Sequence, residues 1–189
     1  MIYLLRHALD DERYVGSWSD IGILESERKK VERMGIYIRD NLPIKKIISS
    51  DIVRAKETAE IIGSKLALPI TLDENLREQN KGLLTGRLKE TLTEEERILI
   101  ENQQIDTKFP DGETLLDVYK RIKKYLDTIN SYPDNSLVVT HRGVINMLYY
   151  ILEDIPLDMD KKRFSCDHLS LHEYDIDKKL IRRIKWLKK

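Results

Sequence analysis

The residues best suited to chemistry in this sequence are two arginines and two histidines that can bind an anionic group. Arg6 and His7 directly follow a short apolar run, and His141 directly follows another. Arg54 lies near the start of a helical segment. An imidazole acts as a nucleophile or a proton carrier, and a guanidinium donates paired hydrogen bonds to a phosphate. Together they would form a cationic pocket that suits a phosphate, with Glu78 as the source of a proton.

The elements around these residues indicate how they would reach one site. The runs 2–5, 46–49 and 137–139 are too short for ordinary helices and are typical of buried strands. The carboxyl ends of parallel strands meet at one edge of an open α/β sheet, and the polar residues follow these ends. Taken alone, each of the first two segments is explained at least as well by side chains that only face solvent. The convergence of three segments favours a site.

The rest of the chain continues the alternation of strands and helices. Further strands are predicted at 69–72, 169–174 and 180–186, and helices at 25–40, 51–63, 115–129 and 144–152. For the helix over 51–63, Ser49 or Ser50 is the expected N-cap and Gly63 the expected end. The stretch 83–112 interrupts the alternation, and we interpret it as an insertion that caps the site. The sequence therefore predicts one α/β domain over residues 1–189 with a small helical cap.

The composition favours a soluble cytoplasmic protein. The chain has 189 residues with 33 basic and 33 acidic side chains, so no net charge draws it to nucleic acid or to an anionic membrane. The sequence shows no signal peptide and no apolar run near the roughly 18 residues of a membrane span. Its single cysteine, Cys166, forms no internal disulfide and fits a reducing compartment. The sequence leaves open whether the chain forms a homodimer.

Competing chemistries leave no comparable pattern in the sequence. It contains no P-loop glycine pattern, no Cys-x5-Arg and no cluster of aspartates for a metal. His168 and His172 have the i, i+4 spacing of a helical metal pair, but the segment alternates like a strand and offers no third ligand nearby. We therefore expect no metal at these histidines.

Five motifs resemble, in their order, the signatures of the histidine phosphatase superfamily, the phosphoglycerate-mutase-like proteins. Each motif is weak alone, but five in the family's order are very specific and cover most of the chain. They are Arg6-His7-Ala8; Ser50, Asp51, Arg54, Ala55, Thr58 and Ala59; Leu76, Arg77, Glu78, Gly82 and Gly86; Phe109 to Thr114; and Val139-Thr140-His141.

This resemblance implies a three-layer α/β/α sandwich with a mostly parallel sheet, and a metal-independent phosphatase with a phosphohistidine intermediate. His7 would be the nucleophile, while Arg6, Arg54 and His141 would bind the oxygens of the phosphoryl group. Glu78 would protonate the leaving oxygen and then deprotonate the attacking water. The resemblance implies no metal and no organic cofactor.

Three departures from the family pattern concern the substrate pocket. Ala8 replaces the usual glycine after the first histidine, and Arg142 replaces the glycine common after the second. The backbone amide of Arg142 still suits a phosphate, and its side chain adds positive charge. The segment between His7 and Gly16 is short and lacks the threonine and asparagine of many members. Arg13 and Gly16 are the substrate-facing candidates in this segment.

The reaction expected from these residues is hydrolysis of a small phosphorylated metabolite, with inorganic phosphate as a product. Sugar phosphates, phosphoglycerates, nucleotide phosphates and phosphoproteins all present the same group to such a site. One alternative is a phosphoglycerate mutase that uses the same histidine, and another is a non-catalytic phosphate-binding module. The mutases of this family have a larger insertion and a C-terminal tail, which favours the phosphatase. The intact set of site residues argues against the binding module.

Overall fold

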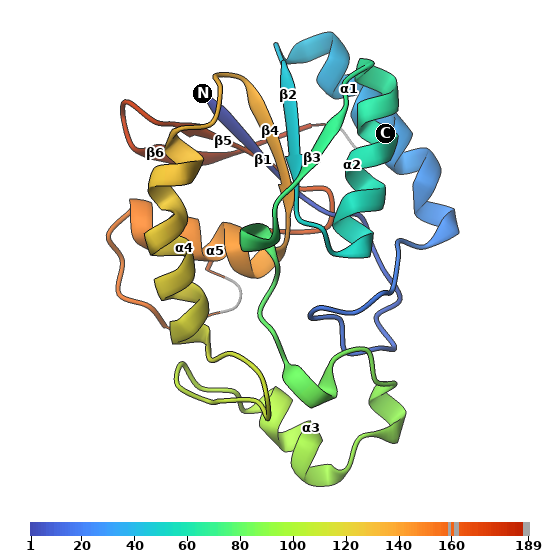
Figure 1. Cartoon of the computed structure of the whole chain (residues 1–189), viewed down its shortest axis with the longest axis vertical. Coiled ribbons are helices and arrows are strands. Elements are labelled where there is room, and N and C mark those ends of the chain that lie inside the picture. The colour runs from blue at the N-terminus through green and yellow to red at the C-terminus, as the bar shows by residue number, and fades with distance from the viewer. Residues whose placement is uncertain (159, 161–162, 187–189) are drawn as a thin grey trace.

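A mixed six-stranded sheet forms the centre of the computed structural model, which describes residues 1–158, 160 and 163–186. Its strands are β1 (Ile2–Arg6), β2 (Lys46–Ser49), β3 (Ile70–Leu72), β4 (Ser136–Thr140), β5 (Leu171–Asp175) and β6 (Leu180–Ile184). They lie in the order β3-β2-β4-β1-β5-β6 (Figure 1). The first four are parallel, and β5 and β6 are antiparallel to their neighbours. The carboxyl ends of β1, β2 and β4 therefore meet at one edge of the sheet.

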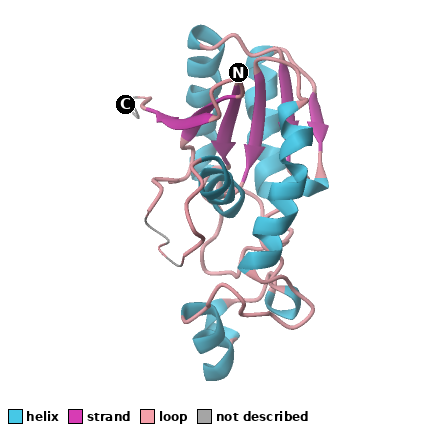
Figure 2. Ribbon diagram, turned by 90° about the vertical axis from the view of Figure 1, so that its left-hand side faces the viewer, coloured by secondary structure: helices cyan, strands magenta, loops and turns pink. Residues whose placement is uncertain are grey.

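Helices cover both faces of the sheet and complete a three-layer α/β/α fold (Figures 1 and 2). The helices on the two faces are α1 (Arg28–Asn41), α2 (Val53–Leu66), α4 (Leu115–Asn130) and α5 (Arg142–Leu152), whereas α3 (Glu94–Glu101) lies apart from the sheet. Side chains of β1 alternate between the faces, as the pleat of a strand requires. Leu5 joins the core cluster of α1 and α2, and Leu4 joins the cluster of α4 and α5. The sheet is thus buried on both sides, which agrees with the predicted fold class.

We use the name cap for residues 83–112, the predicted insertion, which contain α3. This segment lies beyond the carboxyl ends of the parallel strands, at the bottom of Figure 1. Its own small core is formed by Val15, Leu84, Leu92 and Phe109. Gly82 has a φ of +51°, and a Cβ there would lie 1.7 Å from the carbonyl oxygen of Pro110. Only glycine fits this backbone approach.

The start of α2 differs from the prediction in its capping residue. Ile52 occupies the N-cap position and makes no side-chain capping bond. The hydroxyl of Ser50, an expected cap, instead lies 2.9 Å from Nε2 of His141. Asp51, expected in the first turn, lies outside the helix and forms an ion pair with Arg77. The serine is therefore used for a tertiary contact, which the local capping preference does not reveal.

The end of α2 also differs from the prediction. The helix runs past Gly63 to Leu66 and ends with Ala67 in the left-handed conformation, at a φ of +54°. A Cβ at Gly63 would lie 2.8 Å from the carbonyl oxygen of Leu68. The glycine therefore permits a close approach of the backbone inside the helix and does not end it.

The other predicted elements are present with shifted ends. A 3₁₀ turn at Glu25–Glu27 precedes α1, so the first helix is split. β5 begins at Leu171, two residues later than predicted, because Leu169 has a left-handed backbone with a φ of +58°. Among the described helices, none combines the length and the apolar character needed to cross a membrane.

Candidate active site

His7 lies where β1 ends, and its backbone amide donates to the carbonyl of Thr140 at the end of β4, at 3.0 Å. Its side chain is only 4% exposed. Nδ1 lies 2.7 Å from the carbonyl oxygen of Ala8, which only accepts, so Nδ1 carries the proton and Nε2 keeps its lone pair. Burial and the positive charge of Arg54 hold the pKa of His7 well below its usual value. His7 is therefore a neutral imidazole with an unprotonated Nε2, the form that attacks an electrophile.

Arg54 lies in the first turn of α2, the helix that follows β2, and its side chain reaches His7. Its Nε donates to Nε2 of His7 at 3.2 Å, and its Nη2 donates to the carbonyl of Ser17 at 2.8 Å. The backbone of Ser17 is left-handed, with a φ of +54°, in the turn that carries this carbonyl. Nη1 is buried and has no hydrogen-bond partner in the described part of the chain. The N–H bonds of Nη1 thus remain available to a ligand beside His7.

His141 occupies the N-cap of α5, fully buried, with its ring centre 5.1 Å from that of His7. Ser50 lies 2.9 Å from its Nε2, and the same hydroxyl accepts a bond from the backbone amide of Ile52. A hydroxyl can donate one hydrogen bond and accept two, so this contact fits either tautomer of His141. The Nδ1 of His141 is buried and has no partner among the described residues. Burial and the charge of Arg54 lower the pKa of His141 as well.

Arg6 completes the set of donors from the end of β1. Its Nη1 donates to the carbonyl of Cys166 at 2.7 Å, and its Nη2 lies 2.7 Å from Nε2 of His168. Its Nε is buried and has no partner in the described part of the chain. Arg6 and Arg54 each therefore bury a donor nitrogen that the described part of the protein does not satisfy, and Nδ1 of His141 lacks a partner there as well. Such groups are rare in folded proteins and are satisfied together when an anion with several oxygens binds.

Glu78 brings a carboxylate to this cationic pocket. Its Oε2 accepts from the backbone amide of Gly143 at 3.0 Å, and its Oε1 accepts from the amide of Gln79, also at 3.0 Å. Its carbonyl oxygen accepts from Nε1 of Trp18 at 2.7 Å and from Arg121 at 3.4 Å. Backbone and carboxylate are both held, so the carboxylate has a defined position in the pocket.

A cavity of about 360 Å³ lies in front of this site, and His141, which is fully buried, is not among its lining residues. Its walls include Arg6, His7, Arg54 and Glu78, together with two other candidates from the sequence, Gly16 and Arg142. The structure does not bring Arg13, the other substrate-facing candidate, to the cavity. The Arg13 side chain is 78% exposed and binds Asp11. A cavity of this size fits a small metabolite.

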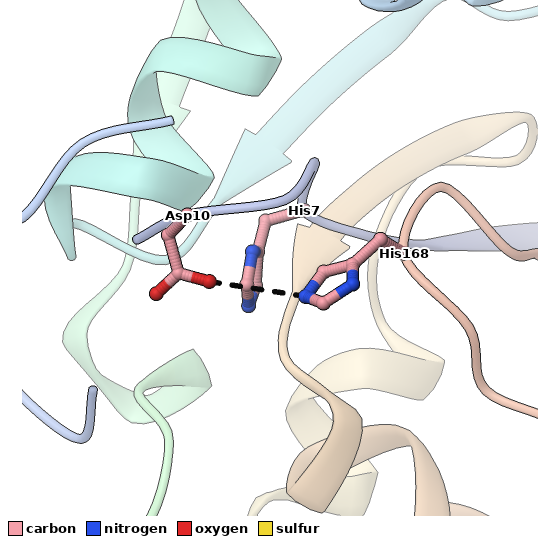
Figure 3. Close-up of side chains that lie close together, drawn as sticks. All are labelled: His7, Asp10 and His168. Carbon is pink, nitrogen blue, oxygen red and sulfur yellow. Dashed lines mark ion pairs between the residues drawn. The ribbon is translucent and has the colours of Figure 1, made fainter. Parts of the chain in front are cut away.

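Asp10 and His168 also line the cavity, and sequence reasoning did not place them there (Figure 3). Asp10 Oδ1 lies 3.8 Å from Nε2 of His168, and Asp10 Oδ2 lies 3.5 Å from Nε of Arg54. Burial raises the pKa of Asp10, and Arg54 partly opposes this shift. His172, which the spacing pairs with His168, is instead buried in β5 against the hydroxyl of Tyr149 at 2.8 Å. The i, i+4 spacing of His168 and His172 therefore did not predict that His168 alone of the two lines the cavity.

His7, Asp10 and His168 offer three ligand atoms within 4.8 Å of one another, the arrangement that a metal ion would need. However, arginine N–H groups point at the ring nitrogens that would coordinate it: Arg54 at His7 and Arg6 at His168. Two guanidinium charges at the ligand atoms oppose the entry of a cation. The same charges attract an anion, so the pocket suits a phosphoryl group better than a metal.

Comparison with known proteins gives the same assignment by independent means. Residues 2–187 match the histidine phosphatase superfamily (branch 1). The chain is 34% identical over 164 residues to the protein named "Probable phosphoglycerate mutase GpmB" of Salmonella arizonae, covering 82% of this chain and 75% of that protein. Among solved structures it is similar to Bacillus stearothermophilus YhfR, with a TM-score of 0.78, 28% identity and coverage of 92% of this chain and 91% of that one.

A mycobacterial glucosyl-3-phosphoglycerate phosphatase shares the fold, with a TM-score of 0.76 at 20% identity, over 98% of this chain and 97% of that one. The match to the family extends over nearly the whole chain, including both histidine segments and the cap. The chain therefore belongs to the histidine phosphatase superfamily.

Proposed function

We propose that this protein is a phosphomonoester hydrolase that acts on a small phosphorylated metabolite through a phosphohistidine at Nε2 of His7. One observation carries the proposal: a neutral, buried imidazole lies beside two arginines, Arg6 and Arg54, each of which has a buried donor nitrogen without a partner in the described chain. A bound phosphoryl group would supply the missing acceptors and place phosphorus in front of the nucleophile.

The reaction would proceed in two displacements at phosphorus. In the first, His7 Nε2 forms a bond to phosphorus as the ester oxygen leaves, and that oxygen takes a proton from Glu78. In the second, Glu78 takes a proton from water, the water oxygen attacks phosphorus, and the bond to Nε2 breaks. Inorganic phosphate leaves and His7 returns to its neutral form. The donors of Arg6, Arg54 and His141 would stabilise the charge on the phosphoryl oxygens in both steps.

The guanidinium groups support a reaction without a metal. Arg6 and Arg54 already place two positive charges in the pocket, and of these Arg54 is buried and Arg6 is partly buried. In a low-dielectric site such charges stabilise a phosphoryl group strongly, which is the task that Mg²⁺ performs in other phosphatases.

A phosphoglycerate mutase is the second candidate, and the relative in Salmonella arizonae bears that name. A mutase must hold its product until the phosphoryl group returns, which requires a closed pocket. Between residues 83 and 112 the cap contains one helix of eight residues, α3, and one complete 3₁₀ turn, Lys89–Thr91. A cap of this size leaves the pocket accessible to water, which supports hydrolysis over transfer.

The test is a search for the covalent intermediate followed by product analysis. Phosphohistidine is labile in acid and stable in base, so samples taken during turnover are quenched in alkali and the adduct is mapped to a residue. We expect the adduct on His7, and none in His7→Ala. With 3-phosphoglycerate, we expect inorganic phosphate as the product. Conversion to 2-phosphoglycerate faster than phosphate release, primed by 2,3-bisphosphoglycerate, would assign the mutase reaction instead.

A further inference from the structure

The backbone around His168 is shaped to bring this side chain to the nucleophile. Leu169 is fully buried and has a left-handed φ of +58°, which is unfavourable for a branched residue. Its amide is shared between the carbonyl oxygens of Arg6, at 3.2 Å, and His7, at 3.3 Å. Its carbonyl accepts from Nε1 of Trp186 at 2.9 Å. The strained turn sends Leu169 into the core and leaves His168 facing the cavity.

His168 in turn fixes the orientation of Arg6. A guanidinium only donates, so at 2.7 Å the Nε2 of His168 must accept from Nη2 of Arg6. The carbonyl of Cys166 accepts from Nη1 at 2.7 Å. Two anchored N–H groups define the plane of the guanidinium. The third nitrogen, Nε, is left buried and without a partner in the described chain.

Asp10 is the other neighbour of Nε2 of His168, but its Oδ1 is 3.8 Å away, beyond a hydrogen bond. A single ring nitrogen cannot accept from Arg6 and donate to Asp10 at once, and the shorter contact decides the assignment. In the structure, His168 therefore acts as an acceptor for Arg6. Its ring centre also lies 5.4 Å from that of His7, so it packs against the nucleophile.

We propose that His168 is a positioning residue of the phosphoryl pocket: it accepts from Arg6 and holds the guanidinium so that Nε faces the bound phosphoryl group. This rests on the proposed function, in that the ligand is taken to be a phosphoryl group. The effect of His168 on phosphate binding should then pass through Arg6 alone. The residue acts on the affinity and orientation of the substrate, and not on proton transfer.

The first experiment compares His168→Gln with His168→Leu, with inorganic phosphate as the probe. Glutamine keeps an acceptor at a similar reach, whereas leucine keeps much of the volume and removes the acceptor. We expect the leucine variant to bind phosphate about 10-fold more weakly, as for a hydrogen bond to a charged group. The glutamine variant should stay within about 3-fold of wild type on the same basis. Asp167→Asn, whose side chain is 64% exposed in the same loop, is the matched control and should bind normally.

A double-mutant cycle separates positioning from a purely structural effect. If His168 acts through Arg6, His168→Leu should weaken phosphate binding less than about 2-fold in an Arg6→Ala background, because residues in one network are not additive. Equal losses in both backgrounds, or a glutamine variant as weak as the leucine variant, would overturn the proposal. Thermal unfolding of each variant shows that it is folded. Should His168→Leu not fold, His168→Ala takes its place in the cycle.

Two further outcomes distinguish a failure of the proposed hydrolase activity from a failure of the positioning role. If wild type hydrolyses no phosphomonoester but binds phosphate with the predicted coupling, the positioning role stands and the proposed hydrolase activity fails. If wild type is an active hydrolase and the cycle is additive, only the positioning role fails. Each measurement is repeated with EDTA and with added Zn²⁺. A dependence of phosphate binding on both Zn²⁺ and His168 would mean that His7, Asp10 and His168 hold a cation, and would overturn the proposal.

Discussion

Gly143→Ala tests whether the position of the Glu78 carboxylate governs the chemical step. A Cβ at residue 143 would lie 2.0 Å from Oε1 of Glu78 and 3.0 Å from its Cδ. Contacts shorter than 3.0 Å essentially never occur at a Cβ, so the carboxylate must move by about 1 Å or more. A displacement of about 1 Å in a catalytic geometry costs about 10²-fold in rate. We therefore expect kcat for an alkyl phosphate to fall about 10²-fold.

The same substitution should leave the fold intact. Gly143 is the second residue of α5, where alanine is the better helix former. The atoms that the new methyl group meets belong to the end of a flexible side chain, which moves at little cost. The melting temperature should therefore stay the same or rise slightly. A loss of activity without a loss of stability would locate the effect at the carboxylate.

The assay uses two substrates that differ in their need for an acid. Glycerol phosphate releases a basic alkoxide that requires a proton, whereas p-nitrophenyl phosphate releases a stable phenolate. Gly143→Ala should lower kcat/KM, which reports the first displacement and not the later attack of water, much more for glycerol phosphate than for p-nitrophenyl phosphate. Glu78→Gln should do the same, by roughly 10²–10⁴-fold. The double variant should be no slower than Glu78→Gln. A wild-type kcat/KM on glycerol phosphate, or equal losses of kcat/KM on both substrates, would refute the role of Glu78 as the acid.

Three other predictions follow from the site, the core and the cap. Activity should persist in EDTA, because Arg6 and Arg54 supply the positive charge; loss on chelation and recovery with Mg²⁺ would contradict this. Burial lowers the pKa of His172 to about 4, below its unfolded value of about 6.5. Above pH 6.5 the imidazole is neutral in both states and has no effect on stability. As the pH drops from 6.5 to about 4, the unfolded state takes up the proton first, so the free energy of unfolding should fall by on the order of 3 kcal/mol. Urea unfolding at several pH values measures this loss, and His172→Gln should show a smaller pH dependence; an unchanged dependence would rule His172 out as its source. Phe109→Ala should destabilise the cap by about 3–5 kcal/mol, since Phe109 is fully buried in its core. Hydrogen exchange should then speed up in the cap and not in the central strands, and uniform acceleration would mean that the cap does not unfold by itself.

The sequence predicted the part of the site that depends on local patterns. His7 and His141 each follow a buried run that can only be a short strand, and Arg54 lies in the first turn of the helix after another. Parallel strands place their carboxyl ends together, so the pattern alone brings these three residues to one edge. The structure places their side chains in contact or close to it.

The parts that the sequence did not reveal depend on contacts between distant segments. His168 reaches the cavity because β5 pairs antiparallel with β1, and because Leu169 adopts a left-handed turn. Neither feature has a pattern in the residues themselves, since leucine is not a typical residue for that backbone. Ser50 is a good N-cap by type, yet its hydroxyl lies within hydrogen-bond distance of Nε2 of His141. In both cases a tertiary contact decides the role of a residue whose local preference indicates another.

Ser17 connects the cap to His7 by hydrogen bonds to Arg54 and to the segment that follows Glu78. Its carbonyl accepts from Arg54, which in turn donates to Nε2 of His7. Its hydroxyl donates to the carbonyl of Gln79 at 2.8 Å and accepts from the amide of Lys81 at 2.7 Å, both in the segment that leads from Glu78 into the cap. A shift of the cap would therefore move the carbonyl that orients Arg54. The order of the cap and the orientation of Arg54 both depend on Ser17. A change in either should therefore alter the hydrogen bond from Arg54 to Nε2 of His7.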